Sequence, residues 1–245
     1  MPILAGAPVN LSIVSHGQGA WLERLIADID RLPTVVSVTV TLNHPETLSA
    51  TLTDRAGVHC VFNQRPRGFG ANHNAAFRHT TAPWFGILNP DLRLPSDPFP
   101  ALLEALQQTG AGVIAPMVVS PDGQRENNAR EFPSPLDLAM KALGRYDGRV
   151  RLTEPQPQAV DWVGGMFLLM PHQAFEALGG FDEGFHLYYE DVDLCARLWK
   201  AGHAVQLLAS KQVVHHAQRA SWRDCRHLRW HLQSASRYFV KHTGR

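Results

Sequence analysis

The sequence has little of several features that often decide a protein's class. It contains only three cysteines in 245 residues, Cys60, Cys195 and Cys225. Because they are few and widely spaced, they exclude a disulfide framework and a CxxC zinc site, and we expect free thiols in a reducing compartment. No apolar run reaches the roughly 18 residues that a membrane-spanning helix needs, and the N-terminal segment lacks the basic start of a signal peptide. We therefore expect a cytoplasmic protein, or one that lies peripherally on the inner face of the plasma membrane.

An excess of charge of one sign is also missing. The 23 lysines and arginines and the 22 aspartates and glutamates leave a formal net charge of +1. This balance gives the chain as a whole no attraction to nucleic acid, which we exclude as a partner. The stretch from Lys211 to Arg245 is the exception, with eight basic residues and one acidic residue. Any strongly basic surface is therefore expected near the C-terminus.

What the sequence does contain is an alternation of strand and helix patterns. β-branched and apolar runs predict strands over residues 9–14, 35–42, 58–62 and 84–88. Apolar residues at helical spacing predict helices over residues 20–32, 70–79 and 98–108. This order predicts a single α/β domain, with a mostly parallel central sheet and helices on both faces. Ligands of such sheets bind beyond the carboxyl ends of the strands.

The second half of the chain is less regular. Residues 133–158 are rich in proline and predict a long loop with one helical stretch, which we interpret as a lid over an acceptor. Further patterns predict a strand over 160–170, helices over 172–178 and 190–201, and short strands over 205–208 and 212–214.

A last helix is predicted over residues 222–241. It carries an apolar stripe of Leu228, Leu232, Ala235 and Phe239, with arginines and lysine on its other faces. Two interpretations stay open. The helix either packs on the core with a solvated basic face, or docks to anionic lipid headgroups or to a phosphate-bearing acceptor.

Several polar residues stand directly after the predicted strands. Asp91, behind Asn89 and Pro90, is where a carboxylate would bind a hard divalent cation, although Asn-Pro-Asp is also good turn chemistry. The Arg67-Gly68-Phe69-Gly70 turn opens a helix, and helix N-termini bind phosphate through their N–H groups. This turn lacks the lysine of a Walker loop and the spacing of GxGxxG, so by itself it is a weak signal.

Acidic residues and histidines gather later in the chain. Five carboxylates lie within 12 residues: Asp182, Glu183, Glu190, Asp191 and Asp193. Helix capping explains one or two of them, but not their density beside a pair of tyrosines. Like charges at this spacing raise one another's pKa, which is the usual route to a carboxylate that acts as a base. Either histidine of the pair at 215–216 would bind a metal or pair with an acid, and a structural role is the alternative.

Four motifs, taken together, point to a known family. RGFGANHNAA, ILNPD, DWVGGMFLLMP and GGFDEGFHLYYEDVDLCARLWKAGH resemble, in this order and spacing, the motifs of family 2 glycosyltransferases. The similarity runs from about residue 9 to residue 221 and is strongest to the bacterial branch of rhamnosyltransferase-like enzymes of surface polysaccharide assembly. It implies a GT-A fold over residues 1–221, with a nucleotide-sugar-binding half over 1–95 and an acceptor-binding half over 96–221. Residues 222–245 would then form a basic amphipathic helix.

The resemblance also implies roles for individual residues. Asp91, as the last residue of a DxD-type motif, and His215 would hold Mg²⁺ or Mn²⁺ against the donor diphosphate, with His216 as the second choice. Asp191 matches the general base that deprotonates the acceptor hydroxyl in an inverting displacement. The residues expected to bind the nucleotide sugar are Ser15, His16, Asn43, Arg67, Gly68, Asn72 and Asn89. Those expected beside the sugar and the acceptor are Trp162, Gly164, Gly165 and Glu190.

Three turns depart from the family pattern. Leu42-Asn43-His44-Pro45 replaces a DNxS-like turn, Ser15-His16-Gly17 replaces a turn that ends in Tyr-Asn, and Arg67 replaces an asparagine. These departures leave the nucleobase open between a dTDP-linked and a UDP-linked donor.

The implied function is transfer of a sugar such as rhamnose from a nucleoside diphosphate sugar to a saccharide or lipid-linked acceptor, with contact to an anionic membrane as a further expectation. The alternative is an inactive, sugar-nucleotide-binding scaffold subunit of a polysaccharide assembly complex. A nucleotidyltransferase or a small-molecule methyltransferase is disfavoured, because the glycine-rich loop that these enzymes carry after the first strand is missing.

Overall fold

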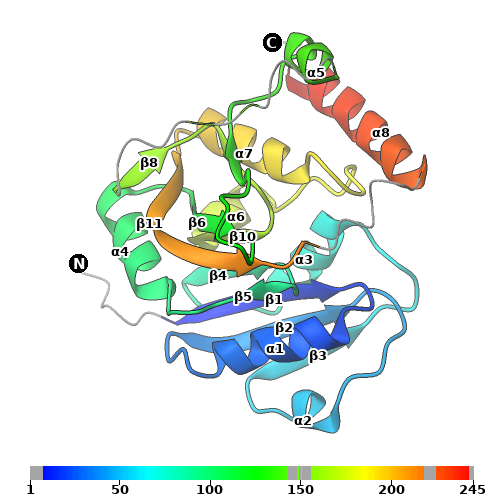
Figure 1. Ribbon diagram of the computed structural model, residues 1–245, viewed down its shortest axis with the longest axis vertical. Helices are drawn as coiled ribbons and strands as arrows, with labels where there is room; N and C mark the ends of the chain where they lie inside the picture. Colours follow the sequence, from blue (N-terminus) through cyan, green and yellow to red (C-terminus); the bar gives the residue numbers. More distant parts are fainter. Residues whose placement is uncertain (1–7, 143–147, 149, 151–155, 218–224, 243–245) are drawn as a thin grey trace.

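The centre of the molecule is one mixed sheet. The computed structural model describes residues 8–142, 148, 150, 156–217 and 225–242. Within them the sheet has the strand order β3-β2-β1-β4-β10-β6-β11-β5, with β8 beside β11, and the short strands β7 and β9 pair separately (Figure 1). The strands are β1 (Val9–Ser15), β2 (Val35–Leu42), β3 (Val58–Phe62), β4 (Trp84–Leu88), β5 (Leu92–Arg93), β6 (Val113–Val119), β7 (Ala129–Arg130), β8 (Pro157–Ala159), β9 (Trp162–Val163), β10 (Phe167–Pro171) and β11 (Val205–His215). The helices are α1 (Gly19–Ile29), α2 (Ala50–Thr53), α3 (Phe69–Phe77), α4 (Phe99–Thr109), α5 (Pro135–Ala142), α6 (His172–Ala177), α7 (Glu190–Lys200) and α8 (Cys225–His242).

The N-terminal half of the sheet is parallel. β3, β2, β1 and β4 run in one direction, so their carboxyl ends meet at the same edge. β10 runs antiparallel between β4 and β6, while β6 and β11 are parallel to each other. The predicted α/β class is therefore confirmed, and the strands over residues 35–42, 58–62 and 84–88 have the predicted bounds.

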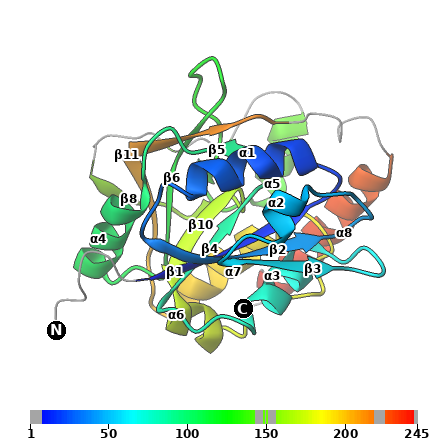
Figure 2. The ribbon, with the colours of Figure 1, turned by 90° about the horizontal axis from the view of Figure 1, so that it is seen from below.

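Apolar layers cover both faces of this sheet. In β4, Trp84 and Leu88 belong to the core under α1 and α4, whereas Phe85 and Ile87 belong to the core under α6 and α7. Figure 2 shows α1 and α2 on one side of the strands and α3 and α6 on the other. Since side chains alternate between the two faces of a strand, a continuous apolar run such as that of β4 is buried on both sides.

Several elements differ from what the sequence pattern predicted. β6 is a fully buried central strand that was not predicted, and the expected strand over 160–170 is broken at residues 164–166 into β9 and β10. The two expected strands over 205–208 and 212–214 are one strand, β11, with an irregular register between Leu208 and Gln212. The proline-rich segment contains α5 and β8. Its residues 143–147, 149 and 151–155 lie outside the described part of the chain, so its action as a lid stays a prediction.

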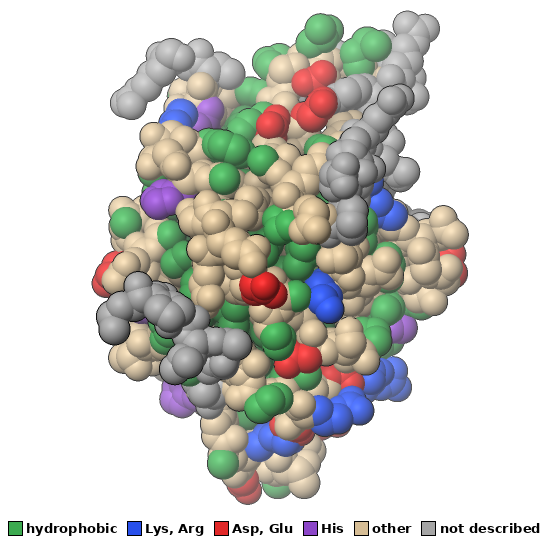
Figure 3. All heavy atoms as spheres, turned by 90° about the vertical axis from the view of Figure 1, so that its left-hand side faces the viewer, with side chains coloured by type: hydrophobic (Ala, Val, Ile, Leu, Met, Phe, Trp, Pro, Cys, Tyr) green, Lys and Arg blue, Asp and Glu red, His purple; other side chains and the backbone are tan. Residues whose placement is uncertain are grey.

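The surface and the thiols bear on the expectations drawn from the composition. On the face shown in Figure 3, acidic side chains are scattered, and most of the visible lysine and arginine side chains lie in the lower part of the view. Cys60 and Cys195 carry free thiols. Within the described ranges, none of the helices combines the length and the apolar character that crossing a membrane requires.

Candidate active site

Strand pairing brings Asp91 and His215 together. β5 pairs with the end of β11 so that Leu92 lies opposite His215, and the His216 N–H donates to the Asp91 carbonyl at 2.9 Å. As a result, His215 Nε2 lies 3.3 Å from Asp91 Oδ1, and both side chains are buried. Nδ1 of the same ring lies 2.8 Å from Oε2 of Glu126. Burial alone would lower the pKa of His215, but the two carboxylates outweigh it and raise that pKa.

The chemistry of this pair fits a divalent cation. Asp91 Oδ1 is buried and accepts no hydrogen bond, so a ligand-type oxygen is left facing an imidazole nitrogen. Adjacent ligands of an octahedral ion with bonds of about 2.1 Å lie about 3 Å apart, and the two donor atoms here are 3.3 Å apart. Among the described residues, no three histidine, cysteine, aspartate or glutamate side chains converge on one point. His216, the second choice, packs on the indole of Trp21 instead.

Asn43 organises the turns at the carboxyl ends of β2 and β3. Its side-chain oxygen accepts hydrogen bonds from the Arg67 N–H and from Asn63, both at 2.8 Å. Its amide donates to the Arg67 carbonyl at 2.9 Å and lies 3.3 Å from Nδ1 of His16. Asn63 also donates to Asn72 at 2.7 Å, so His16, Asn43, Asn72 and the Arg67 backbone, four of the predicted nucleotide-binding positions, form one network. Because these protein groups fill the hydrogen-bonding capacity of Asn43, its contact with a nucleobase stays a prediction that requires one of these bonds to open.

A hollow of about 430 Å³ lies beside this network. It is lined by Leu42, His44, Pro45, Glu46, Thr47, Phe62 and Asn63. Phe62 ends β3 and is 64% exposed, which offers a flat apolar face where ligands of a parallel sheet bind. It was not singled out from the sequence, because an aromatic residue in a strand pattern is normally core. Ser15 ends β1 at the same edge, and its carbonyl accepts the Asn43 N–H at 2.9 Å.

Close contacts fasten the glycine turn to the loop before α7. A Cβ on Gly68 would lie 2.7 Å from the carbonyl oxygen of His186, and a Cβ on Gly70 would lie 2.6 Å from Cβ of Phe181. The Phe69 N–H donates to the same His186 carbonyl at 3.0 Å. Packing therefore explains why this turn needs glycines, and phosphate binding by its N–H groups stays a prediction.

Residues 164–166 link the two predicted halves of the site. The Asn89 N–H donates to the Met166 carbonyl at 2.8 Å, and the Gly165 N–H donates to Oδ2 of Asp191 at 2.9 Å. The Gly164 N–H donates to the carbonyl of Asn128 at 2.8 Å. The break between β9 and β10 thus places Asn89 of the Asn-Pro-Asp motif and Asp191 on either side of one short backbone segment.

Asp191 and Glu190 begin α7. Asp191 accepts a second backbone hydrogen bond, from the Val192 N–H at 2.8 Å, yet burial raises its pKa despite these bonds. Glu190 is buried and its Oε2 has no hydrogen-bond partner; burial, and then the charge of Asp191, raise the pKa of Glu190 well above its usual range. Two neighbouring carboxyl groups at the start of α7 thus both have raised pKa values, and the pair takes up protons at a higher pH than two exposed carboxylates would.

The backbone before this pair is strained. Tyr188 and Tyr189 have φ angles of 69° and 64°, in the left-handed region that costs about 1–3 kcal/mol for a residue with a side chain. The Tyr188 hydroxyl lies 2.9 Å from Nδ1 of His227, and the Tyr189 ring packs against Tyr238, both on α8. These contacts support the strained turn, which sets the direction in which α7 presents Asp191. The sequence singled out the tyrosine pair but not its conformation.

Trp162 and Arg130 lie on the short β7–β9 pair. The Trp162 indole N–H donates to the Glu131 carbonyl at 2.9 Å, and the Arg130 guanidinium lies 5.7 Å from the centre of the indole ring. The charge of Arg130 also lowers the pKa of Asp191, against the effect of burial. Arg130 was not predicted from the sequence, because only strand pairing brings it to this place.

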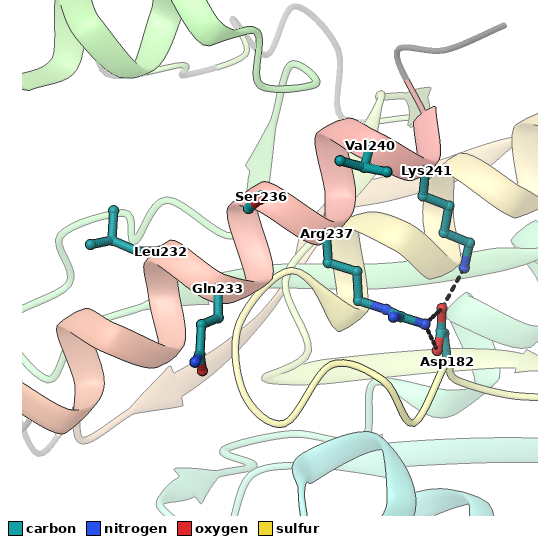
Figure 4. A pocket seen from close by; sticks show the side chains of 7 residues that line it. All are labelled: Asp182, Leu232, Gln233, Ser236, Arg237, Val240 and Lys241. Carbon is teal, nitrogen blue, oxygen red and sulfur yellow. Dashed lines mark hydrogen bonds and ion pairs between the residues drawn. The ribbon is translucent and has the colours of Figure 1, made fainter.

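The remaining acids anchor α8. Asp193 is fully buried and accepts hydrogen bonds from Lys241 at 2.7 Å and His242 at 2.8 Å. Asp182 pairs with Arg237 and Lys241 (Figure 4). Partial burial alone would raise the pKa of Asp182, but hydrogen bonds, above all the one from Lys241, lower it to about 2. Four of the five acids that the sequence grouped together therefore divide into a structural pair, Asp182 and Asp193, and the pair at the start of α7. The fifth, Glu183, accepts a hydrogen bond from the side chain of Asn74 at 3.1 Å.

α8 buries a different stripe from the predicted one. Ala235 is buried, but Leu228 and Leu232 are 62% and 60% exposed, and Val240 is also exposed. Tyr238, outside the predicted stripe, is buried instead. Figure 4 shows the open hollow that Leu232 and Val240 line together with Arg237 and Lys241 of α8 and with Asp182.

Comparison with known proteins gives two family matches and several relatives. A family model described as glycosyl transferase family 2 matches residues 45–160, and one described as the N-terminal domain of galactosyltransferase matches residues 150–219. The chain is 32% identical to N-acetylglucosaminyl-diphospho-decaprenol L-rhamnosyltransferase of Mycobacterium tuberculosis, over 94% of this chain and 84% of that protein. It is 25% identical to the rhamnosyltransferase WbbL of Escherichia coli strain K12, over 95% of this chain and 93% of that protein.

Solved structures share the fold. GalNAc-T7 with UDP, GalNAc and Mn²⁺ superposes with a TM-score of 0.68 at 14% identity, covering 89% of this chain and 44% of that chain. The mannosyltransferase PcManGT of Pyrobaculum calidifontis, in complex with GDP-Man and Mn²⁺, gives a TM-score of 0.61 at 17% identity, covering 94% of this chain and 64% of that chain. The described chain thus spans less than half of the first structure and just under two thirds of the second. The fold is GT-A, as predicted.

Proposed function

This chain belongs to glycosyltransferase family 2, and from that premise we propose that it transfers a sugar from a nucleoside diphosphate sugar to an acceptor hydroxyl with inversion of configuration. The observation that carries the proposal is the segment 164–166, which bonds Asp191 through Gly165 and the metal-binding motif through Asn89. An inverting transfer needs a base for the incoming hydroxyl and a charge-stabilising group for the leaving diphosphate. The base and the charge-stabilising group must lie in one site without touching each other, because the sugar lies between them.

Asp191 would take the proton of the acceptor hydroxyl while the hydroxyl oxygen attacks the anomeric carbon. Two backbone hydrogen bonds fix the carboxylate, and its unused lone pairs are free to accept that proton. Its raised pKa makes the ionised form a stronger base.

Asp91 and His215 would hold the divalent cation, which when bound neutralises the charge of the departing diphosphate. The mixed oxygen and nitrogen donors favour Mn²⁺ over Mg²⁺, which prefers oxygen ligands.

The donor would be a dTDP- or UDP-linked sugar. Rhamnose is the first choice because two relatives are named rhamnosyltransferases. The hollow at the ends of β2 and β3 would receive the nucleobase, with Phe62 as a stacking face. Arg67 and the N–H groups at the start of α3 would contact the diphosphate.

The acceptor would be a saccharide or a lipid-linked saccharide, since the mycobacterial relative is named for a decaprenol-linked substrate. The side chains of α8 support binding of the protein to a membrane surface. Residues 225–242 contain no acidic residue, and exposed Leu228, Leu232 and Val240 lie on a helix that also exposes Arg226 and Arg229. Apolar and cationic side chains in this combination bind anionic lipid interfaces. The enzyme would then act peripherally on the inner face of the plasma membrane.

Calorimetric titration with dTDP, UDP and GDP, each with and without Mn²⁺, tests the nucleotide site. We expect one nucleotide to bind in a Mn²⁺-dependent manner, with the dependence lost in Asp91→Asn. Transfer of the matching sugar to a lipid-linked saccharide then tests the activity. Binding without turnover, when donor and acceptor are both supplied, would instead support the inactive scaffold subunit, and no binding by the folded protein would contradict the nucleotide site.

Co-sedimentation with lipid vesicles tests the membrane contact. We expect binding to vesicles that contain phosphatidylglycerol, weaker binding at high salt, and loss of binding in the double variant Leu228→Ser/Leu232→Ser. Leu136→Ser is the matched control, because Leu136 is an equally exposed leucine on α5. Equal binding to neutral phosphatidylcholine vesicles, or an unchanged double variant, would contradict this role of α8.

A further inference from the structure

We propose that Glu126 is a positioning residue for the metal site: it orients His215 so that Nε2 of the imidazole is available to the cation beside Asp91. The inference rests on the metal site proposed above. It adds a residue that belongs to none of the sequence motifs and that only the tertiary structure brings to the site.

The contact itself is short and sheltered. Oε2 of Glu126 lies 2.8 Å from Nδ1 of His215, and the two side chains are 19% and 10% exposed. On the other side of the ring, Nε2 lies 3.3 Å from Asp91 Oδ1, which is buried and accepts no hydrogen bond. The imidazole is thus held on one nitrogen by a good hydrogen bond, and its other nitrogen faces an oxygen that has no such bond.

The backbone holds Glu126 in this position. After β6, the chain turns tightly at residues 120–124, with Gly123 at a φ of 79°, and returns along the strand it has just left. The Glu126 N–H then donates to the Val118 carbonyl at 2.9 Å. Two residues later, the buried side chain of Asn128 donates to the Pro116 carbonyl at 2.9 Å, which ties the returning segment to β6. Since β6 is paired with β11, Glu126 and His215 are fixed relative to each other.

The chemistry of imidazole makes this contact directional. A neutral histidine carries its proton on one ring nitrogen and a lone pair on the other, and an ionised carboxylate can only accept a proton. Glu126 therefore holds the proton on Nδ1, which leaves the Nε2 lone pair directed at the Asp91 side. Carboxylates in this relation to a metal-binding histidine fix the ring and raise its affinity as a ligand. Glu126 does not serve as a third direct ligand, because no such convergence of three side chains occurs among the described residues.

The test measures Mn²⁺ affinity rather than turnover. Electron paramagnetic resonance of free Mn²⁺ gives the dissociation constant of the protein for Mn²⁺, with Mn²⁺ alone and with Mn²⁺ plus UDP or dTDP. The proteins compared are the wild type, Glu126→Ala, Glu126→Gln, His215→Ala, Asp91→Asn and the double variant Glu126→Ala/His215→Ala. We expect Glu126→Ala to weaken Mn²⁺ binding about 10- to 100-fold. Glu126→Gln keeps the size of the side chain and guards against a folding defect, and the melting temperature of each metal-free variant is measured in parallel.

The double variant separates positioning from a general structural effect. If Glu126 acts through His215, its removal changes the dissociation constant less than about twofold once His215 is alanine. Independent, additive losses would overturn the inference, and so would wild-type affinity in Glu126→Gln and Glu126→Ala. If Asp91→Asn abolishes Mn²⁺ binding while the Glu126 variants bind Mn²⁺ with wild-type affinity, the result supports the metal site and refutes the positioning role of Glu126. If the wild type binds no Mn²⁺ with or without nucleotide, the proposed metal site and the positioning role of Glu126 are both refuted.

Discussion

Asp191→Asn removes the proposed base with the smallest change in shape. The carboxylate accepts one N–H from Gly165 and one from Val192, at 2.9 and 2.8 Å. An asparagine has a single oxygen, so its NH₂ group must face one of these N–H donors, and the lost hydrogen bond costs about 1–3 kcal/mol of stability. Removal of the negative charge also allows the raised pKa of Glu190 to fall back, because the charge of Asp191 contributes to that shift. The folded protein should therefore survive with a modestly lower melting temperature.

Transfer should respond far more strongly. Loss of a general base costs about 10²- to 10⁴-fold in rate, which corresponds to about 3–5 kcal/mol of activation free energy. Nucleotide affinity should stay within about twofold, because the N–H groups and side chains that would bind nucleotide lie on other elements. The assay is single-turnover transfer, with calorimetric nucleotide affinity and melting temperature measured on the same samples. Glu176→Gln, an exposed acid on α6, is the control.

The pH dependence follows from the same geometry. Burial raises the pKa of Asp191 in the folded protein, and only the ionised form accepts a proton. The wild-type rate should therefore fall as the pH drops through this raised pKa. A loss of nucleotide affinity equal to the loss of rate would refute the reasoning, because it would make Asp191 a binding or folding residue. A rate within tenfold of the wild type would refute it as well.

Three further predictions concern other parts of the molecule. Asp193→Asn removes the charge partner of the largely buried Arg197 guanidinium and one of the two charge partners of Lys241, and should cost about 3 kcal/mol of unfolding free energy. Burial alone would raise the folded pKa of Asp193, but hydrogen bonds lower it. The difference from wild type, measured by urea unfolding, is therefore full above the unfolded pKa of about 4 and should close as the pH falls through the lowered folded value. Gly70→Ala should destabilise the fold by about 1–3 kcal/mol in thermal unfolding, because the new Cβ would lie 2.6 Å from Cβ of Phe181. Gly19→Ala is the control and should be neutral or slightly stabilising, because its Cβ would lie 3.4 Å from the nearest atom. Phe62→Ala should weaken nucleotide binding about tenfold in calorimetry if its exposed ring stacks on the base, and an unchanged affinity would place the base elsewhere.

Local patterns predicted much of the fold. The early strands are continuous runs of β-branched and apolar residues, and a run that must be buried on both faces has few alternatives. The same strands end in the polar turns at Asn43, at the Arg67 loop and at Asp91, and these turns lie at the same edge of the sheet, as predicted, while their role in nucleotide binding stays a prediction. β6 was not predicted, although its residues are as apolar as those of the early strands. The break between β9 and β10 was not predicted either, because the whole stretch from 160 to 170 has strand-forming character.

The composition, the βαβ order and the motifs by themselves determined the fold class, the family and the identity of Asp91, Asp191 and His215 as the residues to examine. Only the tertiary structure decided what each acid and histidine faces. Asp193 and Asp191 are two residues apart, yet one meets the cations of α8 and the other meets the Gly165 backbone. Glu126 has no signature in the sequence at all. The physical reason is that pKa, metal affinity and strain depend on neighbours across strand pairs and helix packing, where residues far apart in the chain come within hydrogen-bonding distance.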